Sequence, residues 1–401
     1  MSSETFIPYA RPDIGEEEIR AVTNTLRSGW LTTGPVTFRF EEEFRKSVRA
    51  ASALAVNSCT AGLHVALSAL GIGPGDEVIT TPLTFCSTVN VILETGAKPV
   101  LADVGRDLNL DPDAIRRAIT FRTRAILPVH LAGLPCDMGA VWKIAEEHGL
   151  KVIEDAAHAA GAFYKGTPIG GGRSDAVAFS FYATKNLTTG EGGMVTSPDQ
   201  GLHERMRILC LHGIGRDAWR RYTKEGNWYY EVVERGFKYN MSDIMASIGI
   251  QQLRKLERMT ARRVEIASVY DRAFGEMAEV ELPPRRENCR HCWHLYILRL
   301  HLDKLSIDRA QFFSEMHALG IGCSVHFIPI PLHPYYKTLN LADTWARALA
   351  EYPRLLSIPL YSKMTDDQVK RVIEAVRTIV VKSRQSTSYF VSSSADQRSL
   401  C

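Results

Sequence analysis

The sequence predicts an α/β protein with a large, mostly parallel sheet and a smaller C-terminal α+β domain. Between residues 51 and 196, short apolar runs alternate with helical patterns. This alternation is typical of parallel strands joined by crossover helices. After Pro283-Pro284, a pair that interrupts regular structure, the pattern becomes a shorter mixture of strands and helices. This change indicates a second domain.

The strands expected for the large sheet are short and apolar. They are Leu54–Asn57, Glu77–Thr80, Pro99–Asp103, Ala125–Val129, Lys151–Asp155, Ala176–Phe181 and Gly193–Thr196. Helices are expected between them at Ala61–Leu70, Pro112–Ile119 and Met138–His148. Asp111 before Pro112 combines a capping acceptor with a first-turn proline, and both favour a helix start.

A long helix is expected from about Ser242 to Phe274, with Ser242 as its cap. Beyond it we expect strands near Leu295–Leu300 and Gly322–Phe327, and helices near Arg309–Leu319, Ala342–Tyr352 and Thr365–Val381. The predicted domains are therefore residues 1–250 and 251–382. Residues 383–401 are rich in serine and other polar residues, which predicts a disordered tail.

Composition excludes several classes of protein. A chain of 401 residues is long enough for two domains. Its net charge of +3 gives no electrostatic reason to expect nucleic acid or an anionic membrane as a partner. No run of about 18 uncharged apolar residues suggests a membrane span, and residues 1–13 lack the apolar run of a signal peptide. A cytoplasmic protein is expected.

The eight cysteines are scattered along the chain, which favours reduced thiols over a disulfide framework. Cys289 and Cys292 have CxxC spacing, with His291 and His294 beside them. A zinc site would need a second ligand pair, and a redox motif would open a helix. The segment instead runs into the apolar residues 295–300, so a structural role on a strand is favoured and no metal site is expected.

Two polar motifs follow predicted strands, at the edge where open α/β sheets bind ligands. Asn57–Gly62 combines small and hydroxylated residues at a helix start, which would leave backbone N–H groups for a phosphate. A simple capped helix explains this motif equally well. Asp155 ends an apolar strand and needs a cationic partner. A protonated pyridine nitrogen would serve, although a helix cap or an internal ion pair is commoner.

Two further motifs lie at the same edge. Lys185 follows the strand ending at Phe181 and is flanked by hydroxyl groups. A partly buried lysine becomes nucleophilic and can form a Schiff base, although a surface lysine is the commoner outcome. Glu191-Gly192-Gly193 would permit a close backbone approach. A phosphate cradle, a pyridinium partner and a reactive amine are together what a pyridoxal-phosphate (PLP) enzyme provides.

These motifs resemble those of the DegT-type sugar aminotransferases, a branch of the fold-type-I PLP enzymes. The resemblance extends from Ile7 to about Val381. The matching segments are Ser28–Pro35, Asn57–Gly62, Gly75–Val78, Ile153–His158, Phe179–Phe181, Lys185–Gly193, Tyr239–Asn240 with Ser242–Asp243, and His326–Pro329.

The resemblance implies roles for individual residues. Lys185 would form the Schiff base with PLP and carry protons, and Asp155 would keep the pyridine nitrogen protonated. Thr60, Ala61 and Ser180 would bind the phosphate.

The remaining implied contacts depart in part from the family pattern. His158 stands where relatives often have glutamine and would hydrogen-bond the ring oxygen. Phe85 would stack on the ring where relatives carry tryptophan or another aromatic residue. Asn240 would reach the phosphate from a second subunit, which implies a homodimer with shared active sites.

The implied reaction moves an amino group from glutamate, leaving 2-oxoglutarate, to a nucleotide-linked keto sugar. A UDP- or dTDP-linked 4-keto sugar fits best, in amino-sugar biosynthesis for surface polysaccharide, lipopolysaccharide or a glycosylated metabolite. His326 and the loop 29–35 would contact the sugar. The segment from Arg216 to Lys224 has four cations that suit a nucleotide diphosphate, or equally a solvated loop.

The residues leave three alternative functions open. A PLP-dependent sugar dehydratase would carry histidine in place of Lys185. An amino-acid-directed lyase or desulfurase would need a reactive cysteine on a mobile loop, and none stands out. A non-catalytic regulator of the same fold has no need to keep Lys185, Asp155 and Thr60 together.

Overall fold

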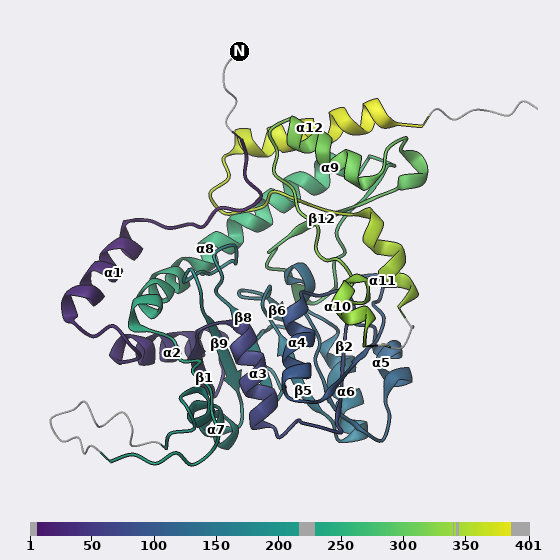
Figure 1. The fold of residues 1–401 in the computed structure, drawn as a ribbon. Coiled ribbons are helices and arrows are strands. Elements are labelled where there is room, and N and C mark those ends of the chain that lie inside the picture. The colour runs from purple at the N-terminus through teal and green to yellow at the C-terminus, as the bar shows by residue number, and fades with distance from the viewer. Residues whose placement is uncertain (1–5, 216–228, 340, 342–344, 386–401) are drawn as a thin grey trace, which may run out of the picture.

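The computed structural model describes residues 6–215, 229–339, 341 and 345–385 (Figure 1). Its largest sheet has seven strands in the order β1-β9-β8-β5-β4-β2-β3. The strands are β1 (Ser52–Val56), β2 (Glu77–Thr80), β3 (Lys98–Leu101), β4 (Thr123–Ile126), β5 (Lys151–Asp155), β8 (Ala176–Ser180) and β9 (Gly193–Ser197). Only β9 runs antiparallel to its neighbours β1 and β8. The seven predicted strands and the mostly parallel sheet are confirmed.

Helices cover both faces of this sheet. They are α2 (Pro35–Val48), α3 (Cys59–Ala69), α4 (Cys86–Glu94), α5 (Pro112–Ala118), α6 (Met138–His148) and α7 (Gln200–Cys210). Helix α1 (Glu16–Ser28) contributes no residue to the cores on either face. Successive strand residues face opposite cores, as the two-residue period of a strand requires. Val152 packs with α2, α5 and α6 in one core, whereas Ile153 packs with α3, α4 and α7 in the other. Burial on both faces explains why these strands are apolar throughout.

A second, antiparallel sheet of three strands has the order β10-β12-β13. It consists of β10 (Val280–Glu281), β12 (Tyr296–Leu300) and β13 (Leu355–Ile358), and packs with α9 (Arg309–Ala318) and α12 (Asp366–Ser383) around a separate apolar core. The expected strand near residues 295–300 and the helices near 309–319 and 365–381 are confirmed. Residues 386–401, most of the expected tail, lie outside the described residues.

The strand expected at Gly322–Phe327 is wrong. This segment forms only single bridges, from Ile321 to Ile7 and from Ser324 to Ser357. Ser357 belongs to β13, whose four residues are all buried, so the segment lies beside this strand without pairing along its length. After Ser324 the chain turns away from the sheet, and His326 and Phe327 line a cavity. The expected helix at 342–352 is present as α11 (Ala346–Glu351), with 342–344 outside the described residues.

Helix α8 (Asp243–Phe274) connects the two cores. Ala246 and Ile250 pack in a core of the large sheet, whereas Tyr270 and Phe274 pack under the small one. The predicted domain boundary between residues 250 and 251 lies within this helix. In the described part of the chain, no helix is long and apolar enough to cross a membrane.

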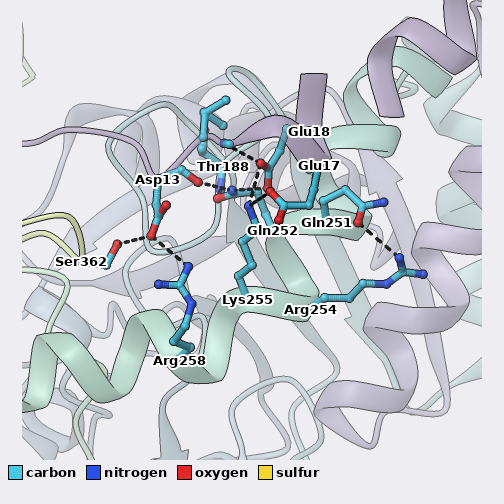
Figure 2. Close-up of polar contacts among 12 residues, drawn as sticks. Asp13, Glu17, Glu18, Thr188, Gln251, Gln252, Arg254, Lys255, Arg258 and Ser362 are labelled. Atoms are coloured by element: carbon cyan, nitrogen blue, oxygen red, sulfur yellow. Dashed lines mark hydrogen bonds and ion pairs between the residues drawn. The ribbon is translucent and has the colours of Figure 1, made fainter. Parts of the chain in front are cut away.

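Helix α1 lies against the N-terminal half of α8 and is fixed there by polar contacts (Figure 2). Gln252 Nε2 donates to the Asp13 carbonyl at 2.7 Å and to Glu18 Oε1 at 2.8 Å. Lys255 Nζ lies 2.8 Å from Glu18 Oε2. Gln252 Oε1 accepts from the N–H of Thr188 at 3.5 Å. The same glutamine therefore joins the N-terminal helix to the loop that follows β8.

Candidate active site

A cavity of about 460 Å³ lies at the carboxyl ends of β5 and β8. This is the sheet edge at which the sequence predicts a ligand. The predicted site residues that line it are Thr60, Phe85, Asp155, His158, Ser180, Lys185 and His326. They come from loops and helix starts far apart in the sequence, and the fold brings them to one place.

Three predicted site residues are not among those lining the cavity. Ala61 is buried within the first turn of α3, where its N–H donates to Ser58 Oγ at 3.1 Å. Asn240 Nδ2 donates to Thr33 Oγ1 at 2.6 Å. Arg216 lies outside the described residues, so its predicted contact with substrate has no structural description.

The N-terminus of α3 forms one wall of the cavity. Ser58 caps this helix, and Ser58, Cys59 and Thr60 line the cavity. Gly193 begins β9 directly behind this turn. A Cβ atom at Gly193 would lie 2.6 Å from Ser58 C and 2.7 Å from both Cys59 N and Phe179 O. The predicted close backbone approach is thus present, and it packs the helix start, with its partial positive charge, against the sheet edge.

Asp155 ends β5 and is 4% exposed. Thr88 Oγ1 donates to Asp155 Oδ2 at 2.8 Å, and the Ala157 N–H donates to Oδ1 at 3.1 Å. Burial raises the pKa of Asp155, while these hydrogen bonds and the charges of Lys185 and His130 oppose the rise. Within the described residues no cation lies in ion-pair distance of this carboxylate, so a cationic group in the cavity would provide its missing ion-pair partner.

Lys185 reaches the same cavity from the loop after β8. Burial lowers the pKa of its amine from 10.5 to about 8, although the nearby Cys59 and Asp155 favour the charged form. Near neutral pH this amine therefore has a far larger neutral, nucleophilic fraction than an exposed lysine has. A buried amine, an unpaired carboxylate and an open helix N-terminus fit the amine-reactive aldehyde, ring nitrogen and phosphate of PLP.

Two predicted histidines carry neutral rings. The Ala132 N–H donates to His158 Nδ1 at 3.3 Å, and burial, with the charges of Lys185 and His326, holds the pKa of His158 well below its usual range. His158 Nε2 therefore carries the proton. Burial, followed by the Lys185 charge, lowers the pKa of His326 to about 4. His326 Nδ1 lies 2.9 Å from Ser357 Oγ, and the ring of Tyr9 stacks on it at 5.4 Å.

Sequence reasoning assigned no role to several other residues that line the cavity, among them Tyr9, Tyr182, His294 and Phe327. Tyr9, His294 and Phe327 belong to segments that precede the large sheet or follow α8, so no local pattern connects them with Lys185. For His294 the one signal was its place beside the CxxC pair.

The CxxC segment itself is only partly a strand. Cys289 lies on a strand, as expected, but on the short β11 (Cys289–Arg290), which pairs with β6 (Phe163–Tyr164). Cys292 lies in the loop before β12, where its thiol donates to the His158 carbonyl at 3.0 Å. The cysteines in the described residues are free thiols. Over the same part of the chain, no three His, Cys, Asp or Glu side chains are grouped as metal ligands.

Comparisons with known proteins identify the family. A model of the DegT/DnrJ/EryC1/StrS aminotransferase family matches residues 12–377. An uncharacterized protein of Methanocaldococcus jannaschii, MJ1066, is 52% identical over 96% of this chain and 100% of its own length. The spore coat polysaccharide biosynthesis protein SpsC of Bacillus subtilis is 51% identical over 94% of this chain and 97% of its own.

Solved structures agree with the sequence relatives. The putative sugar aminotransferase Spr1654 of Streptococcus pneumoniae, in its PMP-form, has a TM-score of 0.88 and 35% identity, covering 94% of this chain and 99% of that one. PseC of Helicobacter pylori, an aminotransferase of pseudoaminic acid biosynthesis, has a TM-score of 0.87 and 30% identity, covering 94% of this chain and 100% of that one. The predicted fold type and enzyme class, a PLP-dependent transaminase, are confirmed. The chain belongs to the DegT/DnrJ/EryC1/StrS aminotransferase family.

Proposed function

We propose that this PLP-dependent aminotransferase moves an amino group from glutamate to a nucleotide-linked 4-keto sugar in amino-sugar biosynthesis for a surface polysaccharide. The observation that carries the proposal is the shared cavity of Lys185, Asp155 and the α3 N-terminus. The names of the B. subtilis and H. pylori relatives support a sugar substrate and a polysaccharide product. The buried free thiols support a reducing compartment, and we place the enzyme in the cytoplasm.

Six residues of the cavity would hold the cofactor. Asp155 would keep the proton on its ring nitrogen, and His158 would donate from Nε2 to its ring oxygen. The remaining contacts would come from Thr60 and Ser180 to the phosphate, Phe85 to the ring face, and Lys185 to the aldehyde carbon. When bound, PLP supplies an electron sink for the carbon that loses a proton.

Lys185 would carry the proton that this chemistry moves. With a pKa near 8, Nζ can both take up and release a proton close to neutral pH, which is the condition for efficient acid–base catalysis. The neutral imidazoles of His158 and His326 leave Lys185 as the group whose charge changes most readily in the cavity. The proposal therefore assigns proton transfer to Lys185.

Substrate contacts are proposed for His326, from its place in the cavity, and for Arg216, from sequence alone. We further propose a homodimer in which Asn240 serves the cofactor phosphate of the partner. Phe85 and Tyr182 support a partner at the cavity mouth, because they line the cavity and yet are 58% and 47% exposed. An apolar groove lies between α1 and the loop 183–190, and it also supports the proposal of a partner subunit.

The test is an assay of the purified protein with glutamate and a panel of UDP- and dTDP-linked keto sugars. Mass spectrometry should find an amino sugar and an equal amount of 2-oxoglutarate, and Lys185→Ala should form neither. A dehydratase would instead give a deoxy sugar that contains no nitrogen. Efficient exchange between amino acids and keto acids, with every nucleotide sugar inert, would show that the substrate assignment is wrong.

A further inference from the structure

The segment around His294 is fixed at the cavity by hydrogen bonds to residues 132–133 and to α8. The N–H of Cys292 donates to the Gly133 carbonyl at 3.1 Å, and the N–H of Leu295 donates to the Ala132 carbonyl at 3.2 Å. On the other side, Arg263 of α8 donates to the His294 carbonyl at 3.3 Å. Gly133 has a positive φ of 93°, and a Cβ there would lie 2.5 Å from Cys292 Sγ. This glycine permits the close approach that fixes His294.

The hydrogen bonds of Asn186 define the tautomer of His294. Asn186 directly follows Lys185, and its Nδ2 donates to the Cys292 carbonyl at 2.9 Å. Its Oδ1 therefore faces His294 Nδ1, at 3.3 Å. Because an amide oxygen only accepts hydrogen bonds, His294 Nδ1 carries the proton.

The second ring nitrogen of His294 is then a free acceptor. Burial, followed by the charges of His158, Lys185, Arg263 and His326, lowers the pKa of His294 well below its usual range, so the ring is neutral and Nε2 is unprotonated. Within the described residues no group hydrogen-bonds to His294 Nε2. The atom is not fully enclosed either, because it is absent from the set of completely buried polar atoms that lack a partner. Since His294 lines the cavity, its Nε2 is available to a ligand.

His158 lies beside it, and the two ring centroids are 4.3 Å apart. The proton on His158 Nε2 is assigned above to the cofactor ring oxygen, so His294 Nε2 is the acceptor left for the substrate. A carboxylate has only acceptor atoms and would leave His294 unsatisfied, whereas a sugar hydroxyl can donate to it. This acceptor therefore suits a hydroxyl better than a carboxylate.

We propose that His294 is a specificity-determining residue whose Nε2 accepts a hydrogen bond from a hydroxyl group of the keto sugar and makes no such contact with glutamate. This inference rests on the proposed function, because it requires a sugar substrate. It predicts that His294 acts in the half-reaction that aminates the keto sugar and not in the half-reaction with glutamate.

Two substitutions separate this role from a merely structural one. In His294→Asn the amide nitrogen can replace Nδ1 and keep the bond to Asn186, but no acceptor remains near Nε2. In His294→Gln the longer amide can place an oxygen near Nε2, while the bond to Asn186 is lost. With holoenzyme, we expect His294→Asn to raise the KM for the keto sugar and the Kd of the amino-sugar product about tenfold, equivalent to one hydrogen bond. His294→Gln should stay within about threefold of the wild type.

The glutamate half-reaction, followed by cofactor absorbance, should change less than about twofold in both variants. His291→Asn is the matched control, since His291 is also buried but does not line the cavity. It should leave the ratio of the two half-reactions unchanged. Equal loss in both half-reactions, or a larger loss in His294→Gln than in His294→Asn, would overturn the inference. A wild-type enzyme that aminates no nucleotide sugar would instead overturn the proposed function, and the inference with it.

Discussion

At the residue scale, burial decides the protonation states in the cavity. Burial disfavours the charged form of each ionisable group, so the pKa of Asp155 rises and that of Lys185 falls. The same effect keeps the rings of His158, His294 and His326 neutral. The cavity therefore holds one amine that readily changes charge and one hydrogen-bonded carboxylate, set among neutral hydrogen-bonding groups.

Lys185→Ala should abolish turnover, with a loss of at least about 10³-fold, because both cofactor attachment and proton transfer depend on the amine. The wild-type apoprotein adds a pH test. Since only the neutral amine reacts, the rate of PLP capture should rise with pH up to about 8 and then level off. Stopped-flow absorbance measures this rate. Lys370→Ala, at an exposed lysine of α12, is the control. Normal transamination by Lys185→Ala would show that Lys185 neither attaches the cofactor nor transfers the proton.

Asp155→Ala and the isosteric Asp155→Asn should both fold and yet lose about 30-fold or more of the activity. The reason is that an electrostatic partner at a reacting centre contributes about 2 kcal/mol or more. Circular dichroism would verify the fold, and Asp367→Asn on the surface of α12 serves as the control. Retention of more than about a tenth of the wild-type activity would contradict the proposed role of Asp155.

Residue patterns predicted the half of the site that lies on the large sheet. Asp155 and Ser180 end apolar strands, and Thr60 and Lys185 follow apolar strands closely, so a parallel sheet brings the four residues to one edge. His294 was interpreted as structural. Its place in the cavity depends on the docking of the segment before β12 against Ala132 and Gly133, a long-range contact that a local pattern does not encode.

At the element scale, prediction succeeded where burial on both faces produces continuous apolar runs. It failed at β13, whose four residues lie between Pro353 and Pro359 and give too short a run to distinguish from the end of a helix. The longer run at residues 322–327 lies beside β13 and pairs with it only at Ser324 and Ser357. This segment does not continue as a strand, and its residues His326 and Phe327 line the cavity.

The contact between α1 and α8 gives a prediction at this scale. Glu18 is 2% exposed; burial raises the pKa of Glu18, but hydrogen bonds from Lys255, Gln252 and Gly15 outweigh it and lower the pKa overall. Lys255→Met should lower the free energy of unfolding by about 1–3 kcal/mol, because it leaves a buried carboxylate without its cation. The stabilisation should be present above the pH at which unfolded glutamate titrates and be lost as pH falls through the lowered pKa.

Urea denaturation at pH 7 and at pH 4 measures both effects of Lys255→Met. The control is Arg254→Met on the same helix, whose ion pair with Glu43 is exposed and should change stability by less than about 1 kcal/mol. An equal loss of unfolding free energy in the two variants would show that the burial of Glu18 does not strengthen its ion pair with Lys255.

At the scale of the whole molecule, α8 spans two cores, and the division into residues 1–250 and 251–382 stays a prediction. The cavity takes residues from both sides of this helix, since Lys185 precedes it while His294 and His326 follow it. Asn240, just before α8, pairs with Val56 in an isolated bridge and hydrogen-bonds to Thr33. Its position away from the lining of its own cavity is the reason to test a role in a second subunit.

Mixing two inactive variants tests whether active sites are shared. If Asn240 serves the partner's cofactor, a dimer of one Lys185→Ala chain and one Asn240→Ala chain has one site with both defects and one with neither, because a two-fold interface makes the exchange reciprocal. Random assembly of equal amounts should then restore about a quarter of the wild-type activity, well above the sum of the two homodimers. Each homodimer must first be shown to be impaired. If each site is built within one chain, every site in the mixture keeps one defect, mixing restores nothing, and Asn240 has no role in a partner's site.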